Sequence, residues 1–249
     1  MREGTKHMKV SIITVCYNSA ATIRRTIESV LHQTYTDIEY IIVDGMSNDG
    51  TLEIIKEFQD IFGNRIKLIS EPDRGIYDAM NKGIRIATGT LIGILNSDDF
   101  YESAAVEHMV YSMTEEKYQI LYGFMRTVKN GDEYTIGRSS HKFLREGMIG
   151  HPACFVTKAV YDDFGCFDLQ YASVSDYDFM LRMSQKERVH FYPVDYLITN
   201  FSLGGMCSTE IAWLELLRLR KNYGIISEKE YRKEIIKDKI YKMYRKLCK

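Results

Sequence analysis

Apolar residues in the first 101 positions form short runs separated by amphipathic stretches. The runs consist of β-branched and aliphatic residues, which is typical of strands buried on both faces of a parallel sheet. The predicted strands are 9–17, 38–43, 66–70 and 91–95. Between them, apolar residues recur at helical spacing from an expected cap at Asn18-Ser19 to about Gln33, after Thr51, and from Ile76 to Ala87. This β-α-β-α-β-α-β order with short links predicts a mostly parallel sheet with right-handed crossovers and flanking helices.

After Asp99 the pattern becomes mixed. Strands are expected at 119–126, 153–157, 189–192 and 195–200, and helices at 103–113, 159–164 and 175–183. Asn130-Gly131 predicts a hairpin turn, and the segment from 134 to 150 reads as irregular. Two helices, near 209–223 and 227–247, end the chain. We therefore predict one continuous α/β domain over 1–210 and a helical tail over 211–249.

Two adjacent carboxylates, Asp98 and Asp99, follow the fourth apolar run directly. They would stand at the carboxyl end of a central strand, the edge where open α/β sheets bind ligands. Adjacent acids repel each other, and a divalent cation held by one or two carboxylates and substrate phosphates relieves that repulsion. A turn followed by a helix N-cap explains the same two residues without any ligand.

Polar and aromatic side chains follow the other predicted strands. The loops contribute Tyr17, Asp44, Arg74, and the Asn96-Ser97 pair ahead of the two acids. An aromatic ring stacks on a base, a lone carboxylate accepts from base or ribose donors, and a cation bridges phosphates, so the set suits a nucleoside diphosphate. Neither a G-x-x-x-x-G-K-[ST] nor a G-x-G-x-x-G segment is present, so P-loop and dinucleotide chemistry are not supported.

Net charge, cysteine spacing and the length of the apolar runs limit the classes of protein to which this chain can belong. The formal net charge of -1 argues against nucleic-acid binding, although the 39 residues from Ile211 carry 12 Lys/Arg and 5 Asp/Glu, a local +7. The five cysteines show no C-x-x-C spacing, which favours reduced thiols in a cytoplasmic setting over disulfides or a zinc site. No 18-residue apolar run predicts a membrane span, and the first residues do not resemble a signal peptide.

Several motifs in order carry a family resemblance. They are Val15-x-Tyr17-Asn18, Val43-Asp44-Gly45-x-Ser47-x-Asp49-Gly50-Thr51, Glu71-x-Asp73-x-Gly75-Ile-Tyr-Asp-Ala-Met-Asn81-Lys-Gly83 and Asn96-Ser97-Asp98-Asp99. Together they resemble family 2 of the glycosyltransferases, densely over 9–101 and more thinly to about Ser208. The resemblance implies the GT-A fold, which is Rossmann-like, and an inverting reaction with a nucleotide-sugar donor. It also implies a nucleotide-binding half at 9–101 and an acceptor-side half at 102–210.

The resemblance assigns roles residue by residue. Tyr17 would lie against the base, and Asp44 would bind the base or ribose. Asp98 and Asp99 would form the D-x-D-type element that contacts ribose and a divalent cation, Mn²⁺ or Mg²⁺. Asn96 departs from the first acid of that element, which leaves open which of the two aspartates ligates the metal.

The catalytic base implied by the resemblance is Asp176. Family members often have Glu-Asp where this chain has Ser175-Asp176, a second departure. Asp178 is the alternative base, although on a helix it would point to a different side. An N-cap for the helix that begins here is the structural alternative for Asp176.

Further residues are expected near substrate. His151 resembles a histidine near the acceptor, and Gly204-Gly205 resembles a loop whose backbone N–H groups donate to the diphosphate. Arg74 is a candidate phosphate or base contact, and Ser97 a candidate substrate contact. A structural histidine, a flexible turn and a solvated arginine are the competing interpretations. Asp73 and Asn81 are expected to fix their loop or cap its helix.

These features predict a metal-dependent hexosyl- or N-acetylhexosaminyltransferase. From the resemblance alone the donor is expected to be UDP-linked, and GDP- or dTDP-linked donors stay open. The sugar would go to a hydroxyl of a growing surface glycan such as O-antigen, capsule or exopolysaccharide, free or lipid-linked. The basic tail suggests peripheral contact of a cytoplasmic protein with the inner face of the membrane, or a homodimer contact. The alternatives are a catalytically degenerate nucleotide-sugar-binding subunit and a nucleotidyltransferase.

Overall fold

A nine-stranded sheet forms the centre of the molecule in the computed structural model, which describes residues 8–129, 132–204 and 210–247. The strands are β1 (Val10–Cys16), β2 (Ile38–Asp44), β3 (Ile66–Ser70), β4 (Leu91–Asn96), β5 (Phe100–Tyr101), β6 (Gln119–Lys129), β7 (Asp132–Gly137), β8 (Cys154–Thr157) and β9 (His190–Ser202). Their order is β3-β2-β1-β4-β8-β6-β9-β5, with β7 paired to the outer part of β6.

Most strands point the same way. The four leading strands pair in parallel, and β8 lies antiparallel between β4 and β6, so β6 again follows the direction of β4. Strand β9 is parallel to β6, whereas β5 and β7 run against their partners. The mostly parallel α/β sheet is therefore confirmed, and the carboxyl ends of β1, β2 and β4 lie at one edge.

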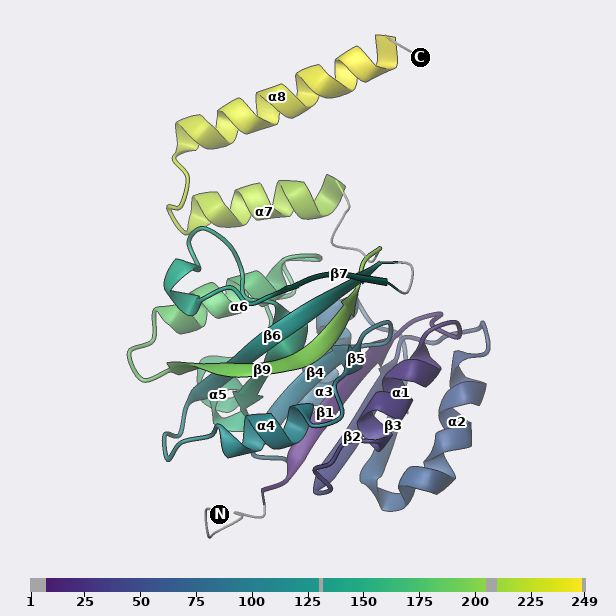
Figure 1. The fold of residues 1–249 in the computed structure, drawn as a ribbon. Helices are drawn as coiled ribbons and strands as arrows, with labels where there is room; N and C mark the ends of the chain where they lie inside the picture. Colours follow the sequence, from purple (N-terminus) through teal and green to yellow (C-terminus); the bar gives the residue numbers. More distant parts are fainter. Residues whose placement is uncertain (1–7, 130–131, 205–209, 248–249) are drawn as a thin grey trace.

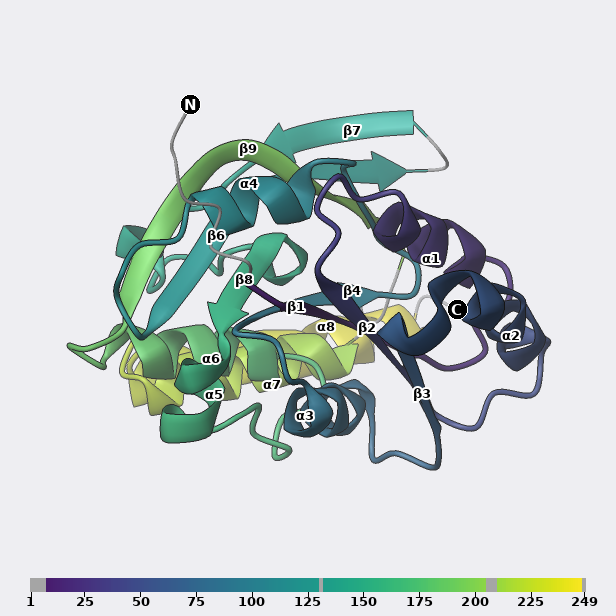
Figure 2. The same cartoon turned by 90° about the horizontal axis from the view of Figure 1, so that it is seen from below.

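Helices cover both faces of this sheet (Figure 1, Figure 2). They are α1 (Ile23–Leu31), α2 (Thr51–Phe62), α3 (Ile76–Ile86), α4 (Ala105–Tyr111), α5 (Lys158–Phe164), α6 (Ser175–Ser184), α7 (Glu210–Asn222) and α8 (Glu228–Leu247). One apolar core joins the sheet to α1, α2 and α4, and a second joins it to α3, α5, α6 and α7. Helix α3 packs closely on β1, because a Cβ at Gly83 would stand 2.5 Å from Ile13 Cγ2.

The tail helices differ from each other. Leu219 of α7 is fully buried in the second core, so this helix is part of the body. Helix α8 lies beyond α7, away from the sheet (Figure 1). Its Ile236 and Ile240 are each 56% exposed. Among the described residues, no helix is both long and apolar enough to cross a bilayer.

Several element boundaries differ from the predictions. Helix α1 starts at Ile23 and not at Asn18-Ser19, because a turn intervenes in which the Thr22 N–H donates to the Ser19 carbonyl at 3.0 Å. The strands expected at 189–192 and 195–200 are one strand, β9, whose pairing with β6 shifts register beyond Tyr122. The segment expected to be irregular from 134 begins as strand β7. The predicted turn at Asn130-Gly131 lies outside the described residues.

Candidate active site

A cavity of about 440 Å³ opens at the carboxyl ends of β1 and β4. Its polar and aromatic walls include Tyr17, Asn18, Ser19, Asp73, Asn96, Ser97 and Asp98. The Tyr17 side chain is 64% exposed, so its ring presents a free face at this edge. The Ser19 and Ser97 hydroxyl oxygens lie 2.8 Å apart and tie the β1 loop to the β4 loop. The edge predicted from the strand pattern thus carries a cavity of nucleotide size, which we call the nucleotide cavity.

The two adjacent acids face different surroundings. Asp98 lines the nucleotide cavity, and burial raises the pKa of its carboxyl. Asp99 has no exposed surface, and its carboxylate accepts from the Ser202 N–H at 2.9 Å. Burial and the neighbouring Asp98 charge raise the pKa of Asp99 to about 8. Of the pair, Asp98 is the one whose oxygens reach the cavity.

The donor set at Asp98 suits a divalent cation completed by substrate phosphates. Among the described residues, no side chain donates a hydrogen bond to the Asp98 carboxylate. In the same part of the chain, no group of three His, Cys, Asp or Glu side chains could hold a metal ion without the substrate. Hard cations commonly take one or two carboxylates and the phosphates of the substrate. Asp98 therefore fits as a protein ligand of a substrate-bound cation.

Asp44 lies behind the nucleotide cavity and not in its wall. It has no exposed surface, and its Oδ2 accepts from the N–H groups of Met46 and Ser47 and from the Ser70 hydroxyl, at 3.1, 3.1 and 2.7 Å. These bonds fix the loop after β2, where Met46 has a left-handed φ of 67°.

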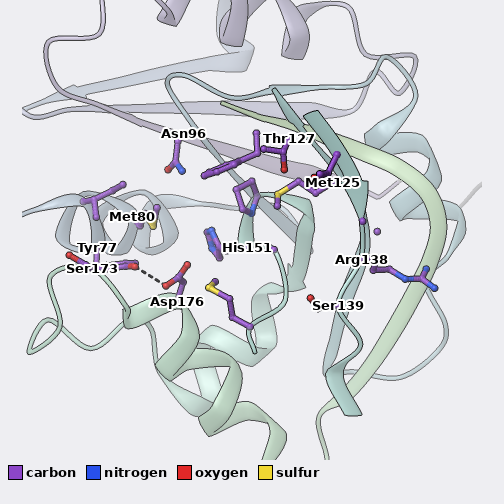
Figure 3. A pocket seen from close by; sticks show the side chains of 18 of the residues that line it. Tyr77, Met80, Asn96, Met125, Thr127, Arg138, Ser139, His151, Ser173 and Asp176 are labelled. Atoms are coloured by element: carbon purple, nitrogen blue, oxygen red, sulfur yellow. Dashed lines mark hydrogen bonds between the residues drawn. The ribbon is translucent and has the colours of Figure 1, made fainter. Parts of the chain in front are cut away.

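A second cavity, of about 500 Å³, continues from the first. The two share Ile76, Asn96 and Phe201 as walls. Polar groups in the second cavity come from Thr127, Thr135, Arg138, Ser139, His151, Ser173 and Asp176, and three methionines, Met80, Met125 and Met148, supply apolar walls. Figure 3 shows how these side chains surround the hollow. We call it the acceptor-side cavity.

Asp176 stands in the first turn of α6 and lines the acceptor-side cavity. The Tyr77 hydroxyl, from α3, donates to Asp176 Oδ1 at 2.8 Å (Figure 3). Ser175 is fully buried, and its hydroxyl donates to the Asp168 carbonyl at 2.8 Å. The serine thus anchors the start of the helix, while the aspartate faces the cavity.

Asp178, the alternative base, points elsewhere. It is buried, and its carboxylate accepts from Arg182 Nε and from the Tyr223 hydroxyl, both at 2.8 Å. It lines neither cavity. Its partners give it a structural role in joining α6 to the residue that follows α7.

His151 lies near Asp176 in the acceptor-side cavity, in a short 3-10 turn before β8. It is 5% exposed, and burial lowers the pKa of its imidazole, partly countered by the Asp176 charge. Its ring meets that of Phe167 edge-on at 5.5 Å. A neutral imidazole at this position can exchange hydrogen bonds with a substrate hydroxyl.

Two predicted substrate contacts, Arg74 and Gly204, do not line either cavity. Arg74 has a side chain that is 78% exposed, and it lies 3.7 Å from Asp78 in an ion pair. Gly204 is exposed, with a φ of 126°, and lines neither cavity. Gly205 lies outside the described residues.

Sequence reasoning missed one residue in the wall of the acceptor-side cavity and one residue that accepts hydrogen bonds from that wall. Tyr77 stands within the quoted Gly75-Ile-Tyr segment, but its link to Asp176 spans 99 positions and has no local signal. Glu215 of α7 accepts from the N–H groups of Ala172 and Ser173 at 2.8 and 2.7 Å, holding the loop ahead of Asp176. Its place in a helix of the tail gave no hint of this contact.

The family model for glycosyl transferase family 2 matches residues 11–183. A PGL/p-HBAD biosynthesis glycosyltransferase from Mycobacterium tuberculosis is 30% identical over 224 residues, which cover 86% of each chain. A chondroitin synthase from Pasteurella multocida is 33% identical over 184 residues, covering 71% of this chain and 19% of the synthase.

Solved structures share the fold at lower identity. The structure of S. aureus TarS 1-349 in complex with UDP-GlcNAc has a TM-score of 0.71 at 19% identity, covering 90% of this chain and 69% of that one. The mannosyltransferase PcManGT from Pyrobaculum calidifontis, in complex with GDP-Man and Mn²⁺, has a TM-score of 0.64 at 16% identity, with 90% and 66% covered. The extent of the family match and the identity to the mycobacterial relative show that this chain belongs to glycosyltransferase family 2.

Proposed function

We propose that this glycosyltransferase is an inverting enzyme that moves a sugar from a UDP-linked donor to a hydroxyl of a surface glycan. The observation that carries the proposal is the continuity of the two cavities. Asp98 lines one and Asp176 lines the other, and both cavities share the wall at Asn96. A donor whose diphosphate lies at Asp98 would present its sugar across that wall to Asp176.

The reaction follows from this separation. Asp176 takes the proton of the acceptor hydroxyl as the oxygen attacks the anomeric carbon from the acceptor side. The bond from that carbon to the diphosphate oxygen breaks on the opposite side, which inverts the configuration. The nucleoside diphosphate leaves with the bonding electrons. A divalent cation, Mn²⁺ or Mg²⁺, held by Asp98 would supply charge neutralisation for the leaving diphosphate.

The protein's own groups orient this step. Tyr77 holds one oxygen of the Asp176 carboxylate, which leaves Oδ2 for the acceptor hydroxyl. The buried side-chain amide oxygen of Asn96, Oδ1, has no hydrogen-bond partner among the described residues, and a sugar hydroxyl would donate to it. The methionine walls suit the apolar faces of sugar rings and exclude water around the base.

The acceptor class has support in the relatives. One relative is a PGL/p-HBAD biosynthesis glycosyltransferase and another is a chondroitin synthase, which supports a glycan acceptor for this chain. We place the acceptor of this chain among surface glycans such as O-antigen, capsule or exopolysaccharide.

Helix α8 would bring the enzyme to a lipid-linked acceptor. Ile236 and Ile240 are exposed one turn apart, and Lys233, Lys237 and Lys239 are exposed near them. A basic helix with an exposed apolar strip suits the anionic inner leaflet of a membrane. Co-sedimentation with phosphatidylglycerol vesicles, and its loss in the double variant Ile236→Ser/Ile240→Ser, would support this placement. Sedimentation without lipid dependence would point to self-association.

A thermal-shift panel tests the proposed function. A ligand that binds only the folded protein raises its melting temperature. We expect UDP and UDP-sugars to raise it, and to raise it further with Mn²⁺. If no nucleotide or nucleotide sugar at millimolar concentration changes the melting temperature, the proposed function is wrong.

A further inference from the structure

Tyr17 and Asp73 line the nucleotide cavity, and Gly45 lies between their side chains. A Cβ placed on Gly45 would stand 2.5 Å from Asp73 Oδ2 and 3.4 Å from Tyr17 Cδ2. The Tyr17 ring and the Asp73 carboxylate are therefore neighbours, separated by the glycine backbone at position 45. Any side chain at position 45 would displace the carboxylate.

The two oxygens of Asp73 have different surroundings. Oδ1 accepts the Gly75 N–H at 2.9 Å and closes the turn before α3, as the sequence predicts for this residue. Oδ2 points toward Gly45, and no donor within the described ranges reaches it. Asp73 itself lines the nucleotide cavity. One oxygen therefore serves the loop, and the other is available to a ligand.

Asp44, the acid that the family resemblance assigns to the base or ribose, has no comparable oxygen. Its carboxylate is fully buried and already accepts from two backbone N–H groups and the Ser70 hydroxyl. A base could reach it only by breaking the loop after β2.

Resting on the proposed function above, we propose that Asp73 Oδ2, and not Asp44, accepts the N3–H of a uracil or thymine base stacked on Tyr17. A carboxylate only accepts hydrogen bonds. Uracil and thymine offer one imide N–H, whereas N3 of cytosine is itself an acceptor and is repelled. Guanine offers two adjacent donors that match two free oxygens, and here one oxygen is engaged by Gly75. The donor class is a uridine or thymidine diphosphate sugar.

The variant Asp73→Asn tests this directly. An asparagine keeps Oδ1 for the Gly75 N–H and puts an NH₂ group where Oδ2 stood, so the turn is preserved and the free group becomes a donor. By titration calorimetry with UDP, dTDP, CDP and GDP, we expect UDP binding to weaken by about tenfold to a hundredfold, the range for a hydrogen bond to a charged group. CDP binding should tighten, because cytosine N3 gains a donor.

Two further variants distinguish a role of Asp73 in recognising the base from a change in the structure of the loop after β2. Asp44→Asn should lower the melting temperature and leave the ratio of UDP to CDP affinity unchanged. Gly45→Ala suits the backbone, since Gly45 is not among the glycines with positive φ, but its methyl group displaces Asp73 Oδ2. Gly45→Ala should lower the affinity for UDP about tenfold. In an Asp73→Ala background the same change should lower it little further, because the carboxylate that the methyl group displaces is then absent.

The outcomes distinguish this inference from the proposed function. If the wild type binds UDP and Asp73→Asn leaves the UDP to CDP ratio unchanged, the role of Asp73 is overturned and the proposed function stands. A wild type that prefers CDP, ADP or GDP overturns the role of Asp73 and the UDP-linked donor of the proposed function, but leaves the proposed sugar transfer standing. A wild type that binds no nucleoside diphosphate overturns both.

Discussion

The Tyr77 hydroxyl donates a hydrogen bond to Asp176 Oδ1 at 2.8 Å, joining α3 of the nucleotide-binding half to α6 of the acceptor-side half. Tyr77 is buried, and its ring also packs on Phe167. The carboxylate is therefore oriented by an element that also walls the nucleotide cavity through Ile76. This contact makes the geometry of the proposed base depend on the donor side of the molecule.

Tyr77→Phe tests that dependence. It removes the hydroxyl and keeps the ring, so we expect kcat for sugar transfer to fall about tenfold, the worth of one hydrogen bond, with the donor KM unchanged. Steady-state kinetics measure both. Tyr40→Phe is the matched control, because Tyr40 is also buried and its hydroxyl donates to Thr14 Oγ1 at 3.0 Å, away from both cavities. Equal losses of kcat in the two variants would contradict a role for Tyr77 in orienting the base.

The pair of acids after β4 gives a second prediction. Asp98 faces the nucleotide cavity, whereas Asp99 has no exposed surface and burial raises the pKa of its carboxyl. Asp98→Asn should abolish the extra thermal shift that Mn²⁺ adds to UDP. Asp99→Asn resembles the protonated acid and should keep that shift. The reverse pattern would make Asp99 the metal ligand.

Glu215 links the tail to the site. Its carboxylate oxygens accept from the N–H groups of Ala172 and Ser173, two residues that wall the acceptor-side cavity and not the nucleotide cavity. Glu215→Gln should therefore lower transfer and leave UDP affinity unchanged, with a stability loss of about 1–3 kcal/mol from the unsatisfied N–H. Glu53→Gln, on the exposed side of α2, is the control. If the transfer rate of Glu215→Gln equals that of the wild type, α7 contributes only packing and does not position the loop at the acceptor-side cavity.

Glu39 predicts how the scaffold responds to acid. Burial raises the pKa of this carboxyl, but hydrogen bonds from Lys67, Ser11 and Thr88 outweigh burial and lower it to about 2 from 4.5. A folded-state pKa below the unfolded value stabilises the fold above about pH 4.5, and this contribution is lost as the pH falls toward 2. Glu39→Gln should cost about 3 kcal/mol at pH 7.

The measurement is urea unfolding of wild type and Glu39→Gln from pH 7 to pH 3. The stability difference between the two proteins should shrink as the pH falls below about 4.5. A difference that stays constant over this range would show that Glu39 contributes packing and not charge.

Local patterns were sufficient for the nucleotide-binding half. Strands β1, β2 and β4 are near-continuous apolar runs, and each ends in a polar loop, so both the strands and the shared edge follow from periodicity. The placement of Tyr17 and Asp98 at that edge follows from the same rule. Helix α1 was extended too far because Asn18, with a left-handed φ of 49°, begins a turn and not a cap.

The acceptor side depends on contacts distant in sequence. The order β4-β8-β6-β9 places strands beside partners that no local pattern specifies. The bonds from Tyr77 to Asp176 and from Glu215 to Ala172 span 99 and 43 positions. Likewise, the family resemblance predicts that Asp44 contacts the base or ribose, and only the three-dimensional arrangement shows which donors already reach the carboxylates of Asp44 and Asp73.

The central claim is that Asp176 removes the acceptor proton while Asp98 serves the departing diphosphate. The most direct test compares Asp176→Asn with Asp178→Asn for UDP release from a UDP-sugar in the presence of acceptor glycan and Mn²⁺, with UDP binding measured in parallel. We predict that Asp176→Asn lowers kcat by about a hundredfold to ten-thousandfold with UDP affinity intact, and that Asp178→Asn chiefly lowers the melting temperature. Wild-type turnover in Asp176→Asn would contradict the account.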